Sequence, residues 1–257
     1  MQLTKNLIVK SQKRLLQMHY ESGVGHIGGN LSCLDALMII YHEFLHVNDR
    51  FILSKGHSAG ALYITLWSLG LIKEDSLKSF HKDDTLLAGH PPAFGIPEIH
   101  FATGSLGHGF SLASGMAKAL KIKKEQGRVF CVTSDGEWQE GSVWEAFIFS
   151  CHHKLNNLTV LVDHNRLQGF GATADIASMA PLSSKIKGFD AEITEVDGHN
   201  LDSLRNALSK KVDRCHIIIM NTTKGHGVNF MQNQMAWHYL PMNEIEYKEA
   251  LENIDNL

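Results

Sequence analysis

Cysteine and proline are scarce in this chain, and neither sign of charge is in large excess. Its 257 residues include 4 cysteines and 5 prolines, and 24 basic against 27 acidic side chains leave a net charge of −3. Four scattered cysteines without a CxxC pair exclude a disulfide-stapled scaffold, so we expect reduced and buried thiols. The weakly acidic balance argues against a nucleic-acid partner, because such proteins usually carry a basic surface for the phosphate backbone.

Long hydrophobic runs are missing as well. The longest ones, such as Leu37–Tyr41 and Ile217–Met220, are far shorter than the roughly 20 residues that cross a membrane. The N-terminal segment also lacks the apolar stretch of a secretory signal, so we expect a cytoplasmic protein without membrane contact. With 44% hydrophobic and 20% charged residues, and without a linker or repeat, the sequence predicts one globular domain over residues 1–257.

The hydrophobic periodicity predicts strands that alternate with helices. Strands are expected in the short apolar, β-branched runs at 51–53, 129–133, 158–163, 191–196 and 216–220. Helices are expected at 3–20, 34–47, 60–69, 110–124, 144–152 and 201–211, with a functional loop over 82–108 and a helical tail after Pro241. This alternation is typical of an α/β fold with a mostly parallel central sheet and helices on both faces.

Two glycine-containing motifs point to other enzyme classes. Residues 23–28 fit the GxGxxG pattern of a dinucleotide-binding loop, but a predicted helix precedes them where the motif needs a strand. Residues 56–60 fit the GxSxG pattern of a hydrolase nucleophile elbow and lie between a strand and a helix, as that motif requires. A hydrolase would also need an acid and a histidine further on, and the sequence does not single these out.

A third motif suggests a zinc site. The segment His42-Glu43-Phe44-Leu45-His46 fits the HExxH pattern, in which two histidines share one face of a helix and the glutamate is a general base. The third zinc ligand is not identified. A zinc metallopeptidase therefore stays open as an alternative from a different class, beside a helix end with exposed polar residues.

Asp135 and Asn165 form a more informative pair. Asp135-Gly136 ends one predicted strand, and Asn165 follows the end of the next strand 30 residues later, which leaves room for a turn, a helix and a strand. The two residues should therefore meet at the carboxyl ends of parallel strands, where open α/β sheets bind ligands. Asp and Asn oxygens suit Mg²⁺ or Ca²⁺ shared with phosphate, and Gly136 allows close backbone approach. A simpler interpretation is that Asp135 only caps the following helix.

The segment from 134 to 165 resembles the thiamine diphosphate motif of the transketolase family, GDG followed by Asn. Further matches in family order cover almost the whole chain: GHIGGNLS at 25–32, FILSKGHSAGALY at 51–63, LAGHPP around His90, ATGSLGHGFSLASGMA at 102–117, SDGEWQEGSVWEA at 134–146, EVDGHN at 195–200 and TTKGHGVNFMQNQMAWH at 222–238. The resemblance implies the three-layer thiamine-diphosphate-binding fold. The family's pyrimidine-binding and C-terminal domains have no counterpart here, so we expect them on a partner subunit, in a hetero-tetramer with two copies of each.

The resemblance implies a metal and diphosphate site. Asp135, Asn165 and the carbonyl of Leu167 would hold Mg²⁺ (or Ca²⁺), which neutralises the diphosphate of the cofactor. Gly136 and Glu137 would offer backbone contacts to the same group.

The resemblance also implies roles around the reacting carbons. His57 and His238 match histidines near the diphosphate and the reacting atoms, and His26 and His90 match histidines that face the donor and acceptor hydroxyls. Other implied positions are, beside the aminopyrimidine ring, Gly104, Ser105 and Leu106 and, at the subunit interface, Glu140 and Glu145.

The implied activity is that of a transferase of carbohydrate metabolism, which moves a two-carbon ketol unit from a ketose (phosphate) to an aldose. The glutamate that activates the aminopyrimidine belongs to the half without a match, so we expect the chain alone to be inactive. A decarboxylase or dehydrogenase component with the same cofactor, and a non-catalytic scaffold that only binds a partner, stay open as alternatives.

The sequence departs from the family pattern around the pocket. Ser134 replaces the first glycine of GDG, Ile27 replaces a usual proline, and GFG stands at 169–171 where many members have isoleucine-aspartate-glycine. Ser105 and His108 occupy positions that are often proline and glutamine. These changes favour a specialised, biosynthetic sugar substrate over the standard pentose phosphates.

Overall fold

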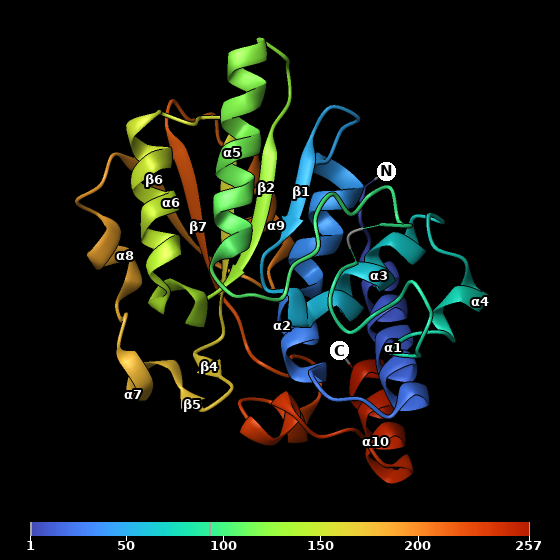
Figure 1. The fold of residues 1–257 in the computed structure, drawn as a ribbon. Helices are drawn as coiled ribbons and strands as arrows, with labels where there is room; N and C mark the ends of the chain where they lie inside the picture. The colour runs from blue at the N-terminus through green and yellow to red at the C-terminus, as the bar shows by residue number, and fades with distance from the viewer. Residues whose placement is uncertain (1, 93, 257) are drawn as a thin grey trace.

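The computed structural model describes residues 2–92 and 94–256. Within these residues, five strands form one parallel sheet in the order β1-β2-β3-β7-β6. The strands are β1 (Arg50–Leu53), β2 (Val129–Ser134), β3 (Leu158–His164), β6 (Ala191–Asp197) and β7 (Cys215–Asn221). Figure 1 shows the sheet with the short β4–β5 hairpin and the segment before the C-terminal helix lying beyond the carboxyl ends of the strands. The predicted α/β fold with a parallel central sheet is therefore confirmed.

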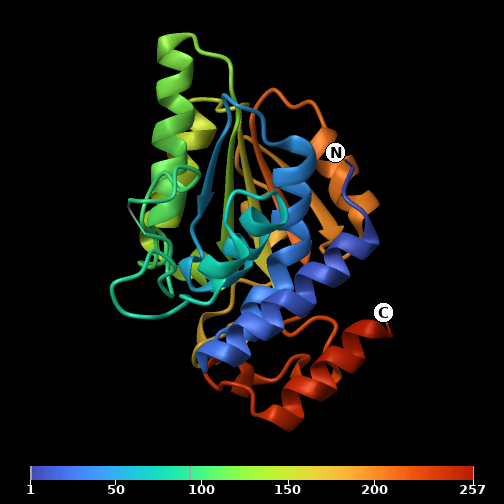
Figure 2. The ribbon, with the colours of Figure 1, turned by 90° about the vertical axis from the view of Figure 1, so that its right-hand side faces the viewer.

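Helices cover both faces of the sheet, as Figure 2 shows from the side. One face carries α5 (His108–Lys123) and α6 (Gly141–His152). The other face carries α2 (Ile27–Ile39) and α9 (Leu201–Ser209), with α1 (Lys5–Ser22), α3 (Ala59–Ser68) and α10 (Glu244–Asp255) packed outside them. The shorter elements are a π-helical turn (Ile40–Phe44), α4 (Glu74–Leu77), α7 (Thr173–Ala177), α8 (Leu182–Ile186), β4 (Leu167–Gln168), β5 (Gly171–Ala172) and 3₁₀ turns at Gly56–Ser58, Gly136–Gln139, Asn229–Met231 and Met235–His238.

The helix α1 begins and ends where local capping chemistry allows. The hydroxyl oxygen of Thr4 accepts a hydrogen bond from the backbone N–H of Leu7 at 3.3 Å. Gly23 closes the helix in a left-handed conformation with φ of 64°, which favours glycine. Neither α1 nor any other described helix combines the length and apolar character needed to cross a membrane.

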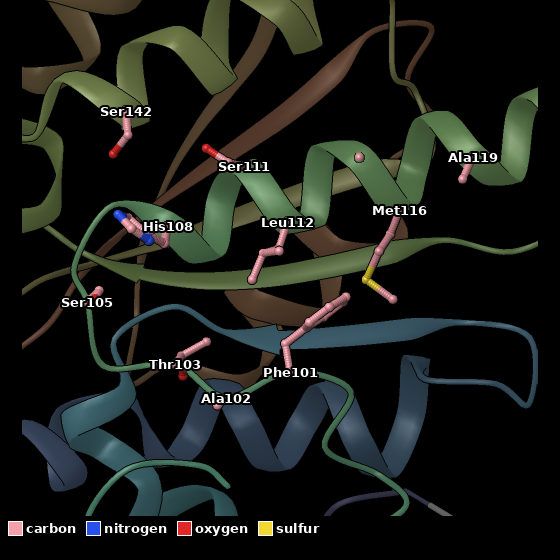
Figure 3. A pocket seen from close by; sticks show the side chains of 11 residues that line it. Phe101, Ala102, Thr103, Ser105, His108, Ser111, Leu112, Met116, Ala119 and Ser142 are labelled. Carbon is pink, nitrogen blue, oxygen red and sulfur yellow. The ribbon is translucent and has the colours of Figure 1, made fainter. Parts of the chain in front are cut away.

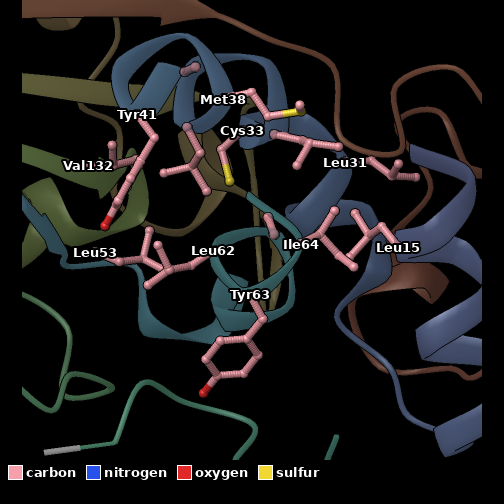
Figure 4. Close-up of a cluster of buried hydrophobic side chains, with 14 of the residues drawn as sticks. Leu15, Leu31, Cys33, Met38, Tyr41, Leu53, Leu62, Tyr63, Ile64 and Val132 are labelled. Atoms are coloured by element: carbon pink, nitrogen blue, oxygen red, sulfur yellow. The ribbon is translucent and has the colours of Figure 1, made fainter. Parts of the chain in front are cut away.

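The sheet separates two hydrophobic clusters. Figure 4 shows part of the larger one, to which Leu15 of α1, Leu31 of α2, Leu62 of α3 and Val132 of β2 belong. The second cluster lies under α5 and α6 and contains Phe110, Trp138 and Phe147. Burying each such side chain contributes about 1.5–3 kcal/mol to folding. The expected reduced and buried thiols are also found, because all four cysteines are free and buried.

The start of α2 differs from the sequence-based prediction. We predicted a helix over 34–47, but α2 begins at Ile27 and contains both Gly28 and Gly29. At Gly28 the helix packs closely against its surroundings. A Cβ there would lie 3.1 Å from a side-chain carbon of Lys224 and 3.2 Å from the carbonyl oxygen of Trp237, so a larger residue would force its neighbours to shift. Tertiary contact thus overrides the low helix propensity of glycine.

The HExxH segment does not form a zinc site. Its helix loosens into the π turn that ends at Phe44, and His46 follows in a non-helical segment. His42 is hydrogen-bonded to Ser68 (Nε2 to Oγ, 2.9 Å), and Glu43 forms an ion pair with Arg205. The two histidines therefore do not share one helix face, and this finding removes the basis for the metallopeptidase alternative.

The other two short motifs also serve the fold. Residues 23–28 follow α1 and include the first two residues of α2, so a helix and not a strand precedes them. Ser58 of the GxSxG segment is buried and donates its hydroxyl to the carbonyl of Gly29 at 2.9 Å. A serine buried in this way joins two segments and is not placed as a nucleophile.

Candidate active site

A cavity of about 440 Å³ opens at the carboxyl edge of the sheet. Loops after β1, β2, β3 and β7 and the start of α2 surround it, as expected for a ligand site in an open α/β sheet. Ten of the sequence-predicted site residues line it: His26, His57, Gly104, Leu106, Asp135, Gly136, Glu140, Asn165, Leu167 and His238.

Asp135 is held by the backbone around it. Its Oδ1 accepts a hydrogen bond from the N–H of Gly136 at 2.9 Å, and its Oδ2 accepts from the N–H of Arg166 at 2.7 Å and from the hydroxyl of Thr173 at 3.1 Å. Burial, followed by the nearby negative charge of Asp163, raises the pKa of this carboxyl. Asp135 also caps the 3₁₀ turn at Gly136–Gln139, so the simpler interpretation describes part of what this residue does.

Asn165 lies in the same cavity with a defined amide orientation. Its Oδ1 accepts a hydrogen bond from the N–H of Leu167 at 3.1 Å. Its Nδ2 donates to Asp163 at 3.1 Å and to Ser32 at 3.4 Å. The two neighbouring strands thus bring Asp135 and Asn165 to one site, as their spacing suggested.

The oxygen atoms available here suit a hard cation. Asp135 offers a carboxylate, Asn165 an amide oxygen, and Leu167 a backbone carbonyl that accepts a hydrogen bond from Lys224 at 3.3 Å. Carboxylate and carbonyl oxygens are the ligands of Mg²⁺ and Ca²⁺, and no cysteine or histidine would be required. The donor set therefore fits the predicted cation and disfavours zinc.

Three histidines meet beside this donor set. The ring centroids of His26, His57 and His238 lie 5.1–5.9 Å from one another. Burial lowers the pKa of all three, with that of His238 reaching about 3 because Lys224 also lies close. The rings are therefore neutral near pH 7, and each can donate one hydrogen bond and accept another.

Four predicted residues lie outside the cavity lining. His90 packs close to Gly104, where an added Cβ would come within 3.0 Å of its ring. Ser105 lines a neighbouring groove, and Glu145 is exposed on α6. Glu137 is fully buried and accepts hydrogen bonds from Ser54, from the N–H of Gly107 at 2.9 Å and from the N–H of Ser134 at 2.8 Å. Its side chain therefore supports the loops around the cavity from outside.

Three charged residues of the site were not identified from the sequence. Lys55 and Asp163 are both fully buried and form an ion pair beneath the cavity. Lys224 lines the cavity, and its Nζ lies 2.7 Å from Nδ1 of His238. Burial and the charge of Lys55 lower the pKa of Lys224 to about 8. The available signal was that Lys55 and Lys224 lie inside the matched motifs and that Asp163 precedes Asn165 by two residues on a strand.

An apolar groove of about 890 Å³ runs beside the cavity along α5. Figure 3 shows Leu112 and Met116 of α5 facing the groove and Phe101 extending toward Met116 from the opposite wall. Near the cavity mouth, the side chains of Phe170 and Tyr239 are 90% and 55% exposed. Exposed apolar side chains gathered in a groove are typical of a protein-protein contact.

One other group of described residues gathers metal-ligand types, namely Asp35, His199 and His226. Both ring nitrogens of His199 are already engaged: Nδ1 lies 2.9 Å from Asp35 and Nε2 accepts from the N–H of Thr223 at 2.9 Å. The rings of His199 and His226 are stacked in parallel at 3.5 Å. The in-plane lone pairs of two parallel rings cannot converge on one ion, so this arrangement is not a metal site.

Comparison with known proteins gives a consistent result. The family model described as "Transketolase, thiamine diphosphate binding domain" matches residues 5–254. An apulose-4-phosphate transketolase subunit of Phocaeicola vulgatus is 34% identical over 258 residues, which cover 95% of this chain and 91% of that protein. The 6-deoxy-6-sulfo-D-fructose transketolase subunit SqwG of a Clostridium species is 32% identical, with 91% and 89% covered.

Solved structures of longer proteins share the fold. Transketolase of Campylobacter jejuni superimposes with a TM-score of 0.86 and 25% identity over 99% of this chain. Transketolase of Leishmania mexicana gives a TM-score of 0.89 at 23% identity. This chain covers only 43% and 42% of those two proteins, so it spans about two fifths of their length.

Proposed function

Because the chain belongs to the transketolase family, by its match to the thiamine diphosphate binding domain, we propose that it is the diphosphate-binding subunit of a two-subunit transketolase. In this role it would transfer a two-carbon ketol unit from a ketose to an aldose once its partner is bound. Two relatives that it covers almost end to end are themselves named as one subunit of a transketolase, which supports a division of the enzyme into two chains.

The cavity is proposed to bind thiamine diphosphate with Mg²⁺ or Ca²⁺. The observation that carries this proposal is that Asp135, Asn165 and Leu167, which offer carboxylate, amide and carbonyl oxygens, line one cavity at the carboxyl edge of the sheet. Gly136 leaves room for the diphosphate, and Lys224 adds a positive charge there. The coenzyme, when bound, supplies the nucleophilic carbon for ketol transfer, and the protein supplies binding and orientation.

The histidines are proposed to hold and move protons at the sugar. Neutral His26, His57 and His238 can donate hydrogen bonds to oxygen atoms of the diphosphate or the substrate. His90 stands next to Gly104 and is proposed to reach the substrate from the open side of the cavity. Other proposed contacts, to the aminopyrimidine ring, are those of Gly104, Ser105 and Leu106.

The partner subunit is proposed to cover the apolar groove and the cavity mouth. Glu140 lies at the cavity and Glu145 on the neighbouring exposed face of α6, so both are proposed interface residues. The partner would bring the pyrimidine-binding domain, and two copies of each chain would form a hetero-tetramer. We propose that the single chain is inactive, and its cytoplasmic location stays a prediction.

The substrate is proposed to be a specialised sugar. The similar proteins named above are called transketolase subunits for apulose-4-phosphate and for 6-deoxy-6-sulfo-D-fructose, and this supports a sugar outside the standard pentose phosphates. Phe170, which departs from the family pattern, lies at the cavity where it would change the wall beside the coenzyme.

Purification of the chain with its natural partner tests the proposal. Ketol transfer should require both chains, thiamine diphosphate and a divalent cation, and should be measured with a panel of ketose donors and aldose acceptors. Carbon dioxide release without transfer would instead support a decarboxylase, and a complex that does not bind the coenzyme would support a scaffold. Appreciable transfer by the single chain would contradict the two-subunit proposal.

A further inference from the structure

Asp163 is a buried carboxylate that faces a candidate metal ligand and not the cavity. Its Oδ2 accepts hydrogen bonds from Lys55, from the hydroxyl of Ser32 at 2.6 Å and from Nδ2 of Asn165 at 3.1 Å. Its Oδ1 accepts from the hydroxyl of Thr222. This one side chain therefore joins α2, the loop after β1, β3 and the end of β7.

The carboxylate determines which way round the Asn165 amide lies. Asp163 lies near the end of β3 and Asn165 directly follows that strand, with Nδ2 of Asn165 3.1 Å from Oδ2 of Asp163. An ionised carboxylate can only accept hydrogen bonds, whereas the two ends of an amide differ, since one donates and the other accepts. Asn165 must therefore turn Nδ2 toward Asp163, and Oδ1 is left facing Leu167 at the cavity.

Lys55 makes such a carboxylate tolerable beneath the site. A fully buried charge is costly unless it is paired, and Lys55 supplies the pairing charge while it also donates to the carbonyl of Gly29 at 2.9 Å. The charge of Asp163 is thus compensated within the protein, and Asp135 is left as the carboxylate that faces a cation.

We propose that Asp163, compensated by Lys55, is a positioning residue that holds the Asn165 oxygen toward the cation of the coenzyme. The inference rests on the proposed function. It predicts that removal of Asp163 weakens cation binding although Asp163 does not touch the cation. Mutation of a residue that is hydrogen-bonded to a metal ligand typically lowers metal affinity by about 10–100-fold.

The first test measures Mn²⁺ binding with thiamine diphosphate, by electron paramagnetic resonance, on the full chain purified with its partner. Asp163→Asn should weaken Mn²⁺ affinity by about 10–100-fold. Thr194→Val is the matched control, because it removes a sheet hydrogen bond to His216 (2.9 Å) away from the site and should leave Mn²⁺ affinity unchanged. Urea denaturation of each variant separates stability from binding.

A swapped pair supplies a readout that a purely structural role would not move. Asn165→Asp alone places two carboxylates together and should also weaken Mn²⁺ binding, although a carboxylate is a good ligand. Asn165→Asp combined with Asp163→Asn reverses the hydrogen bond and should recover most of the affinity. If Asp163→Asn does not fold, Lys55→Met with Asp163→Asn removes both charges together and takes its place.

The outcomes separate the two proposals. Wild-type protein that binds no Mn²⁺ with the coenzyme overturns the proposed function and this inference together. Wild-type binding that persists undiminished in folded Asp163→Asn, or a swapped pair whose loss equals the sum of the two single losses, overturns the positioning role alone.

Discussion

The backbone N–H of Arg166 donates a hydrogen bond to Oδ2 of Asp135 at 2.7 Å. This contact ties the residue that follows Asn165, after the end of one strand, to the residue that follows the neighbouring strand. The two proposed metal ligands are thus fixed relative to each other by the chain itself. Such preorganisation reduces the ordering that binding of a cation must impose.

Replacement of Asp135 should therefore affect both the cation and its surroundings. In Asp135→Asn a charged ligand is lost, and one of the two acceptor oxygens becomes an NH₂ group. This group cannot accept the hydrogen bond from Gly136 or, in the opposite amide orientation, those from Arg166 and Thr173. We expect Mg²⁺-dependent binding of thiamine diphosphate to weaken by at least about tenfold, measured by titration calorimetry. Asp175→Asn, at an exposed position on α7, is the control. Unchanged binding in Asp135→Asn would refute the assigned ligand role.

The side chain of Glu137 should stabilise the fold. Glu137→Ala leaves Ser54 and the N–H groups of Gly107 and Ser134 without their acceptor. Each unsatisfied buried donor costs about 1–3 kcal/mol, so the free energy of unfolding in urea should fall by several kcal/mol. Glu145→Ala, on the exposed face of α6, should have little effect. An equal effect of both changes would contradict this account.

The buried His216 should make the protein sensitive to acid. Burial lowers its pKa to about 4 in the folded state, while the unfolded chain takes up the proton near the ordinary value of about 6.5. The unfolded state thus gains protons first, and stability should fall as pH decreases from about 6.5 to about 4, by up to about 1.4 kcal/mol per pH unit. His216→Gln should reduce this slope by the contribution of one proton, about 1.4 kcal/mol per pH unit, in urea denaturation measured across that pH range. His152→Gln, at an exposed position, should not.

The apolar groove should be required for assembly. A charged side chain at Leu112 or Met116 would have to be buried against the partner, so Leu112→Asp and Met116→Asp should abolish co-purification of the two subunits. Ile122→Asp provides the control, because Ile122 lies on the same helix, is 70% exposed and is outside the groove. A complex that survives both groove changes would place the interface elsewhere.

Most of the architecture could be predicted from the sequence. The β-branched runs at β2, β3 and β7 are found within one or two residues of their predicted bounds, because buried parallel strands need continuous apolar sequence. The meeting of Asp135 and Asn165 followed from strand order alone. The predicted start of α2 was wrong because Gly28 packs closely against Lys224 inside the helix, and no local sequence pattern indicates such a distant neighbour.

The charged part of the site could not be predicted in the same way. Lys55 and Asp163 are 108 residues apart in the sequence, and each alone is typical of an exposed position. Only the fold shows that the two neutralise each other beneath Asn165. Likewise, Glu137 belongs to a matched motif, but only the fold shows that its side chain is buried and accepts hydrogen bonds from the loops that contain Ser54 and Gly107.

The apolar groove along α5 also has a consequence for synthesis of the protein in the cell. In a chain without a bound partner, the groove lined by Phe101, Leu112 and Met116 is open to solvent, and exposed apolar surfaces of this kind favour aggregation. If the proposed two-subunit assembly is correct, synthesis of both chains in matched amounts would keep this surface covered.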